Sequence, residues 1–179
     1  MRSRRSVKQR FIDRDVEDNV LSQVLESATW APSAHNSQPW AFVVIKDNVT
    51  KRKLAENMAL VWRSNFEKKA TPSDERERRI STSIERISNA PVVIVVCLTT
   101  EYLRQYVDER KRVCEHIMAI QSVAAAIQNL LLAAYELNLG SCWMCAPLFS
   151  QQMVRATLGI PDHVEPQALV LLGYFEGSI

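Results

Sequence analysis

Residues 4–8 carry side chains that suit a bound phosphate. They are two guanidinium groups, a hydroxyl and an ammonium, from Arg4, Arg5, Ser6 and Lys8. Arginine forks bind phosphate oxygens bidentately, and lysine adds a point charge. A solvated basic terminus has the same composition, so that interpretation stays open. A nucleic-acid arm is disfavoured, because no aromatic stacking platform accompanies the cluster and the chain's net charge is only +2.

The segment APSAHNSQPW, residues 31–40, is a second candidate for ligand binding. Asn36 and Gln38 each carry a carboxamide that both donates and accepts, which suits the edge of a ring bearing carbonyl and N–H groups. Ser33 adds a hydroxyl, and two prolines stiffen the segment, so less entropy is lost on binding. A plain loop rich in Ser, Asn and Pro is the alternative.

The stretch CWMC at residues 142–145 is a C-x-x-C pair. This spacing could serve a dithiol redox centre, because it lowers thiol pKa values. A zinc site would need a second cluster, and Cys97 and Cys114 do not form one. The sequence favours small, half-buried thiols in a core strand, predicts no metal site, and leaves a thiol–disulfide function as a minor alternative.

Glycine is scarce, and its placement excludes whole classes of nucleotide site. All four glycines lie at or after Gly140, so the chain lacks an N-terminal G-x-G-x-x-G fingerprint and a glycine-rich phosphate loop. Side chains must therefore provide most of the contacts to any nucleotide-like ligand. No nucleophilic triad or isolated carboxylate pair stands out either, so we expect no catalytic side chain and infer that a bound cofactor supplies the chemistry.

Hydrophobic periodicity predicts an α+β fold in which helices cover a sheet. We expect strands over residues 40–45, 91–98, 141–146 and 167–175. We expect helices from residue 18 to near Pro32 and over residues 51–66, 73–86, 113–137 and 150–158. The stretch Asn138-Leu139-Gly140 is typical of a helix stop with glycine just past the end.

The segment Ile117–Ala134 is apolar enough to raise the question of a membrane span. Gln, Ser and Asn residues interrupt it, and their side chains would lack partners in a bilayer. We therefore expect a central helix buried by its own domain and a partner subunit, and no membrane contact. No apolar signal segment follows the basic N-terminus, so we expect one cytoplasmic domain over residues 1–179.

Taken together, these segments resemble the nitroreductase family of FMN-dependent oxidoreductases. The matching stretches are RRSVK, ATWAPSAHNSQPWAFVVI, SNAPVVIVV, AAIQNLLLAAYELNLGSCWM, LGIP and ALVLLGYF. Their order and spacing cover nearly the whole chain. The stretch IQNLLLAAYELNLGSCW is also similar to the nitroreductase-like domain of deazaflavin-coenzyme biosynthesis proteins.

The resemblance implies an intertwined homodimer with a central mixed or antiparallel sheet, a long dimer-core helix and two FMN sites at the interface. The implied phosphate and ribityl ligands are Arg4, Arg5, Ser6 and Lys8. The loop that reaches the same flavin from the other chain carries Pro32, Ser33, Ala34, Asn36 and Gln38. The backbone facing the flavin N5 and pyrimidine edge is that of Ala146, Pro147 and Leu148, and Arg86 corresponds to a basic residue near a flavin carbonyl.

The implied activity is ping-pong hydride transfer from NAD(P)H through FMN to a small-molecule acceptor of the nitroaromatic, quinone or enone class. Tyr102–Tyr106, with Trp62, is a candidate cover over the flavin by its position. Two departures keep a flavin- or deazaflavin-binding module without efficient turnover as the alternative. Pro147 stands near the N5 position and has no N–H, and the closing residues 174–179 lack the basic tail of many members.

Overall fold

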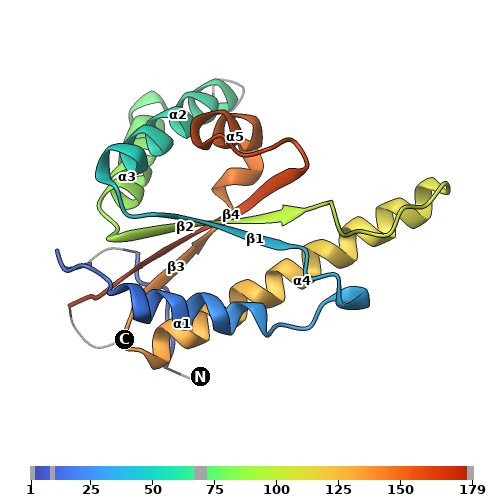
Figure 1. Cartoon of the computed structure of the whole chain (residues 1–179). Helices are drawn as coiled ribbons and strands as arrows, with labels where there is room; N and C mark the ends of the chain where they lie inside the picture. The colour runs from blue at the N-terminus through green and yellow to red at the C-terminus, as the bar shows by residue number, and fades with distance from the viewer. Residues whose placement is uncertain (1–2, 9–10, 67–71, 177–179) are drawn as a thin grey trace.

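The computed structural model describes residues 3–8, 11–66 and 72–176 and forms an α+β fold (Figure 1). The strands are β1 (Trp40–Ile45), β2 (Val92–Thr99), β3 (Gly140–Met144) and β4 (Val164–Gly173). The helices are α1 (Asp18–Thr29), α2 (Asn48–Phe66), α3 (Ser73–Ser88), α4 (Glu109–Glu136) and α5 (Gln151–Leu158). Two 3₁₀ helices, η1 (Ala34–Asn36) and η2 (Ala146–Phe149), lie in the connections. The expected elements are all present, with small shifts at their ends.

The four strands form one sheet in the order β1-β2-β4-β3, and each neighbouring pair is antiparallel. Of the two expected sheet types, the antiparallel one is therefore found. The N-terminal segment extends the β3 edge through a parallel bridge between Ser6 and Ser141. Phe11 and Phe175 form a further, antiparallel bridge just beyond β4.

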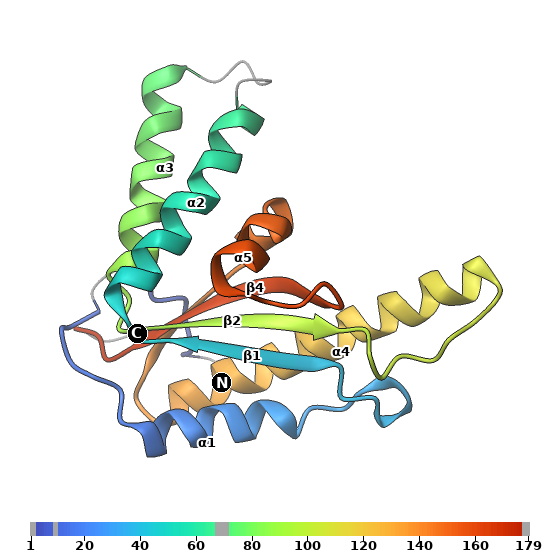
Figure 2. The ribbon, with the colours of Figure 1, turned by 45° about the horizontal axis from the view of Figure 1, so that its top comes forward.

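Helices cover both faces of the sheet, which explains why β2 is buried at every position. Figures 1 and 2 show α1 and α4 on one face and α2, α3 and α5 on the other. Val92, Ile94 and Val96 pack toward the first face, while Val93 and Val95 pack toward the second. A strand that is buried on both faces has no polar alternation, and this agrees with the run PVVIVVCL.

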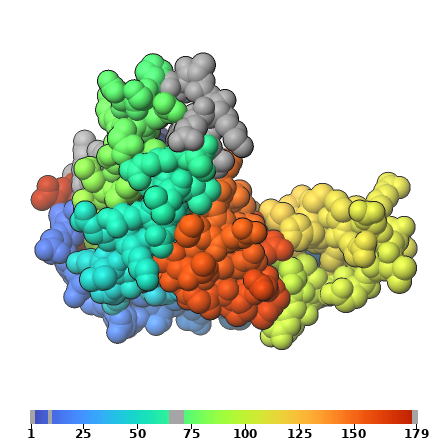
Figure 3. Space-filling model, turned by 90° about the horizontal axis from the view of Figure 1, so that it is seen from above, coloured from blue at the N-terminus to red at the C-terminus, as the bar shows by residue number. Residues whose placement is uncertain are grey.

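Helix α4 is long and apolar enough to span a membrane by length and composition, and it is the one such helix among the described residues. Its inner face packs against α1 and the sheet, as the expected core helix requires. Its first turns and residues 100–108 project beyond the body as an arm (Figure 3). Val113 and Ile117 on the arm are about half exposed, so part of this helix remains uncovered in a single chain.

The end of α4 corrects one expectation about glycine. The left-handed residue after the helix is Asn138, with φ of +60°, while Gly140 already belongs to β3. Asparagine adopts this conformation more readily than other non-glycine residues, so it replaces glycine at the stop. Gly159, with φ of +67°, does end α5 in the expected way.

Candidate active site

The predicted phosphate ligands lie along the β3 edge of the sheet. The Val7 N–H donates to Ser141 O at 2.9 Å, which seats residues 6–8 beside the start of β3. Tyr135 Oη donates to Ser3 Oγ at 2.7 Å and anchors the segment to the last turn of α4. Arg5 is exposed, and its Nη1 donates to Arg4 O at 3.0 Å. Backbone pairing therefore fixes residues 4–8, which we call the basic strip, and leaves its basic side chains on the surface.

Gly140 permits the basic strip to pack closely against β3. A Cβ at Gly140 would lie 2.9 Å from Phe175 Cδ1 and 3.0 Å from Val7 Cβ. Such distances are shorter than normal van der Waals contact, so a side chain there would push the strip outward. The glycine serves packing at this position rather than ending the helix.

The Cys142 thiol of β3 lies within electrostatic reach of two cations, Arg86 and Lys8. Burial raises the pKa of Cys142, and the nearby charges of Arg86 and Lys8 oppose the rise. Arg86 comes from the last turn of α3, and the neighbouring Ile87 shares a core cluster with Cys142 of β3. The Arg86 Nε is buried and has no hydrogen-bond partner among the described residues. A buried donor without an acceptor is costly, and a ligand carbonyl or phosphate oxygen would satisfy it.

The η2 turn follows β3 on the same side as Cys142. Pro147 is buried, and the Leu148 N–H donates to Cys145 O at 3.2 Å within the turn. Because proline has no N–H, the backbone donors among Ala146, Pro147 and Leu148 are those of Ala146 and Leu148 alone, and Leu148 would have to give up its bond to Cys145. The prediction that these three residues face a flavin stays a prediction.

The loop that holds Pro32, Ser33, Ala34, Asn36 and Gln38 has a strained backbone without any glycine. His35, Asn36 and Gln38 have φ values of +57°, +54° and +45°. Left-handed residues other than glycine cost roughly 1 kcal/mol or more each, so the surroundings must hold them. Three hydrogen bonds contribute, namely Ala34 N–H to Ser122 Oγ (3.2 Å), Gln38 N–H to Ser33 Oγ (3.0 Å) and Gln38 Nε2 to Asn36 Oδ1 (3.2 Å).

One chain does not bring the two groups of predicted ligands together. Ser6 pairs with Ser141, which lies at the level of Val92, whereas the loop leads into Trp40, which pairs with Leu98. Six residues along β2 correspond to about 20 Å at roughly 3.3 Å per residue. The loop also packs on α4, while Arg86 belongs to α3 on the opposite face of the sheet (Figure 1). Completing one site from both groups therefore requires a second chain.

The candidate cover residues are likewise apart. Tyr102 is exposed on the arm, while Trp62 of α2 is partly buried against a core cluster on the other face of the sheet. Figure 2 shows α2 and the arm at opposite sides of the molecule. A joint cover from Tyr102 and Trp62 within one chain is therefore not formed.

Two buried charged residues, Glu115 and Lys51, were not predicted from the sequence. Glu115 is buried at 3% exposure, and its Oε2 lies 3.7 Å from His35 Nε2. An acidic residue four positions before the buried Ala119 of an apolar helix was the available signal. Lys51 is also buried, at 2% exposure, and no local pattern distinguishes it from its solvated neighbours.

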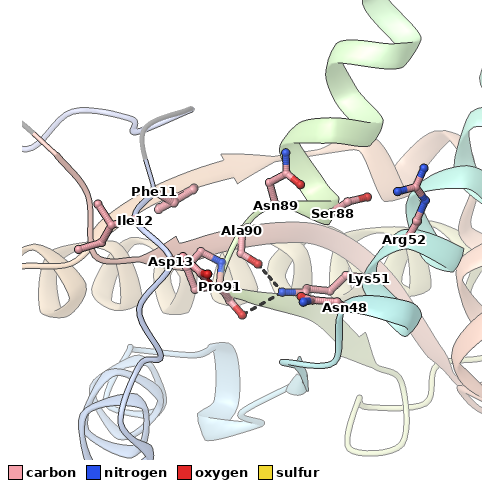
Figure 4. A pocket seen from close by; sticks show the side chains of 10 residues that line it. All are labelled: Phe11, Ile12, Asp13, Asn48, Lys51, Arg52, Ser88, Asn89, Ala90 and Pro91. Carbon is pink, nitrogen blue, oxygen red and sulfur yellow. Dashed lines mark hydrogen bonds between the residues drawn. The ribbon is translucent and has the colours of Figure 1, made fainter.

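Figure 4 shows the cavity around Lys51, of about 410 Å³. The Lys51 Nζ donates to Ala90 O at 2.6 Å and to Pro91 O at 3.1 Å. Burial lowers the pKa of Lys51, while the charges of Asp47, Asp15 and Asp13 oppose the shift. The lysine thus ties the start of α2 to the turn between α3 and β2. None of the predicted flavin ligands lines this cavity.

Comparison with known proteins identifies the family. The family model described as the Nitroreductase family matches residues 1–174. An Archaeoglobus fulgidus protein assigned as an NADH dehydrogenase/NAD(P)H nitroreductase is 30% identical over 174 residues, covering 96% of this chain and 81% of that protein. The BluB-like flavoprotein of Clostridium difficile 630 superposes with a TM-score of 0.79 at 26% identity, covering 98% of this chain and 88% of that one.

A further similar structure is a complex with FMN. It is described as a nitroreductase in complex with FMN, from Desulfovibrio desulfuricans, and superposes with a TM-score of 0.72 at 25% identity. The match covers 98% of this chain and 84% of that one. The family model, the relative and the two similar structures each match nearly the whole length of this chain. They confirm the resemblance that the motifs indicated. The chain belongs to the Nitroreductase family.

Proposed function

We propose that the protein is a homodimeric FMN-dependent oxidoreductase of the cytoplasm that uses NAD(P)H to reduce nitroaromatic, quinone or enone acceptors in a ping-pong cycle. One observation carries the proposal. The buried Arg86 Nε lacks an acceptor within the described part of the chain, and the charges of Arg86 and Lys8 both act on the Cys142 thiol of β3. Relatives named NAD(P)H nitroreductases and a neighbour in complex with FMN support the choice of ligand.

The residues present fit FMN at each of its polar parts. The basic strip with Arg4, Arg5 and Lys8 suits the phosphate, and Ser6 suits the ribityl hydroxyls. Arg86 suits a ring carbonyl, since its Nε is buried and unsatisfied. When bound, FMN supplies the two-electron chemistry between the nicotinamide and the acceptor. The protein's own contribution is binding, orientation and positive charge near a reduced ring, with no side-chain acid or base required.

The dimer is supported by two independent features. First, the loop with Asn36 and Gln38 lies about 20 Å along the sheet from the basic strip, so each flavin would take ligands from both chains. Second, the α4 arm leaves Val113 and Ile117 about half exposed. Exposed apolar side chains in one stripe are typical of a surface that a partner covers.

A flavin-binding module without efficient turnover is the second candidate, and Pro147 favours it. This residue stands where the family resemblance places the backbone facing N5, and it provides no N–H. Loss of a donor at a developing negative charge slows such reactions by about 100- to 1000-fold. The two candidates differ in rate rather than in ligand.

The visible spectrum of the purified protein, before and after added FMN, tests both candidates. Flavin bands that co-purify or appear on reconstitution support them, and a protein that never retains FMN excludes both. Anaerobic bleaching by NADH or NADPH, followed by rapid reoxidation with menadione or nitrofurazone, then supports the enzyme. Bleaching that takes hours supports the binding module.

The ligand assignment has its own variants. The double variant Arg4→Ala/Arg5→Ala and the single variant Arg86→Met should each weaken FMN binding at least tenfold, because each removes cationic groups from the site. The matched control is Lys53→Ala/Arg78→Ala, which removes two exposed cations from α2 and α3 and should leave the affinity unchanged. Equal FMN affinity in all variants would contradict the assignment.

A further inference from the structure

The loop that carries Asn36 and Gln38 needs a partner that holds its left-handed residues in place. His35 and Asn36 are both left-handed, and His35 is the residue between the two hydrogen-bonded ends of η1. The Ala34 N–H is fixed to Ser122 of α4. The His35 side chain extends toward the same helix, where Glu115 lies about two turns before Ser122.

Glu115 is a buried carboxylate in which one oxygen accepts a hydrogen bond and the other does not. Its Oε1 accepts the Arg104 N–H at 3.2 Å. Its Oε2 is buried, has no hydrogen-bond partner within the described residues, and lies 3.7 Å from His35 Nε2. Burying a charged oxygen without a partner is strongly unfavourable. Glu115 Oε2 therefore faces His35 of the loop rather than solvent.

The 3.7 Å separation is within ion-pair range but too long for a hydrogen bond. A sub-ångström shift of the loop toward α4 closes it, and the strained residues adjacent to His35 are the ones that such a shift would move. Hydrogen bonds at functional sites commonly tighten only when the ligand is bound. The Glu115–His35 contact therefore already restrains the loop in the free chain at ion-pair distance, and it can shorten to a hydrogen bond when ligand is bound.

We propose that Glu115 is a positioning residue that clamps the loop through His35 and so fixes the carboxamides of Asn36 and Gln38 for the flavin edge. This inference rests on the proposed function for its ligand. The same carboxylate also holds Arg104, in the segment between β2 and α4. Glu115 therefore joins the ring-edge loop to residues 100–108 of the arm, and the two segments are positioned together.

Hydrogen exchange on the FMN-free protein tests the clamp without relying on the cofactor. Glu115→Gln keeps a carbonyl acceptor for Arg104 but removes the charge facing His35. His35→Asn removes the reach to Glu115 while asparagine still tolerates the left-handed backbone. Each variant should increase exchange at residues 34–38 about tenfold. Glu136→Gln, an exposed glutamate on the same helix, should not. Unchanged exchange at residues 34–38 in both Glu115→Gln and His35→Asn overturns the proposal.

FMN affinity then separates positioning from general stability. Each single variant should weaken FMN binding about tenfold, and Glu115→Gln/His35→Asn should also weaken it about tenfold, because the residues act as one unit. A hundredfold, additive loss, or a fall in melting temperature with unchanged FMN affinity, overturns the proposal. If the wild type itself fails to bind FMN, the proposed function fails, while the exchange experiment still decides whether the clamp exists.

Discussion

Tyr174 Oη donates a 2.6 Å hydrogen bond to Glu17 Oε2, which joins the end of β4 to the residue before α1. Arg14 completes the group, because its guanidinium lies 3.8 Å from the Tyr174 ring centroid and donates to Glu17 Oε1 at 2.9 Å. The three side chains are on the surface, so they act in water rather than in the core. They hold the segment that follows the basic strip against the end of the sheet.

The first prediction concerns acid stability at this group. Donation by Tyr174 is the largest cause that lowers the pKa of Glu17 from 4.5 to about 2. The unfolded chain therefore binds more protons between about pH 2 and 4.5, so the stabilisation is present above that window and is lost as pH falls through it. Tyr174→Phe should flatten the fall of the melting temperature between pH 6 and pH 2. Tyr102→Phe, an exposed tyrosine, is the control, and parallel curves for Tyr174→Phe and wild type would contradict the assignment.

The second prediction compares two glycines. Gly140→Ala should weaken FMN binding several-fold, because the new Cβ contacts Val7 and displaces the adjacent Ser6 and Lys8. Gly159→Ala places its Cβ in open space but strains a left-handed residue, so it should cost about 1 kcal/mol of stability without changing FMN affinity. Flavin fluorescence titration and urea unfolding measure the two effects. Equal FMN affinity in both variants would show that the Val7 contact does not position the strip.

The third prediction concerns the buried lysine. Lys51→Met should destabilise the fold by about 1–3 kcal/mol, because two backbone carbonyls lose their donor. Burial lowers the pKa of Lys51, so the unfolded chain binds more protons as pH approaches 10.5 and the wild type gains stability in that range. Lys51→Met should lack this gain. Lys53→Met, on the exposed side of α2, is the control in urea unfolding at pH 7 and pH 10.

The fourth prediction distinguishes buried thiols from a redox pair. All four cysteines are free, and Cys97 and Cys142 are buried while Cys114 and Cys145 are exposed. Burial raises the pKa of Cys97 to about 12, so its reactive thiolate is essentially absent at neutral pH. In a Cys114→Ser background, iodoacetamide should label one thiol per chain within minutes, detected by mass spectrometry. Mild oxidation that removes two thiols at once would instead indicate a Cys142–Cys145 disulfide.

The sequence by itself determined the elements and the family. The strand Trp40–Ile45 has the same bounds in the structure as in the periodicity, and the apolar run at residues 92–99 becomes a strand covered on both faces. These signals are local, because side chains two to four positions apart decide whether a segment alternates or follows a helical stripe. The loop at residues 31–40 was recognisable for the same reason, since its prolines and carboxamides are consecutive.

The tertiary structure decided which of these residues meet. Only strand pairing places Ser6 beside Ser141, and only the packing of α3 on the sheet brings the charge of Arg86 within reach of the Cys142 thiol. It also separates the loop of Asn36 and Gln38 from that cluster by the length of a strand, which a linear motif cannot express. Contacts between distant positions depend on which faces bury together, and burial is a property of the whole packed chain. For that reason the buried Glu115 beside His35 becomes visible only in three dimensions.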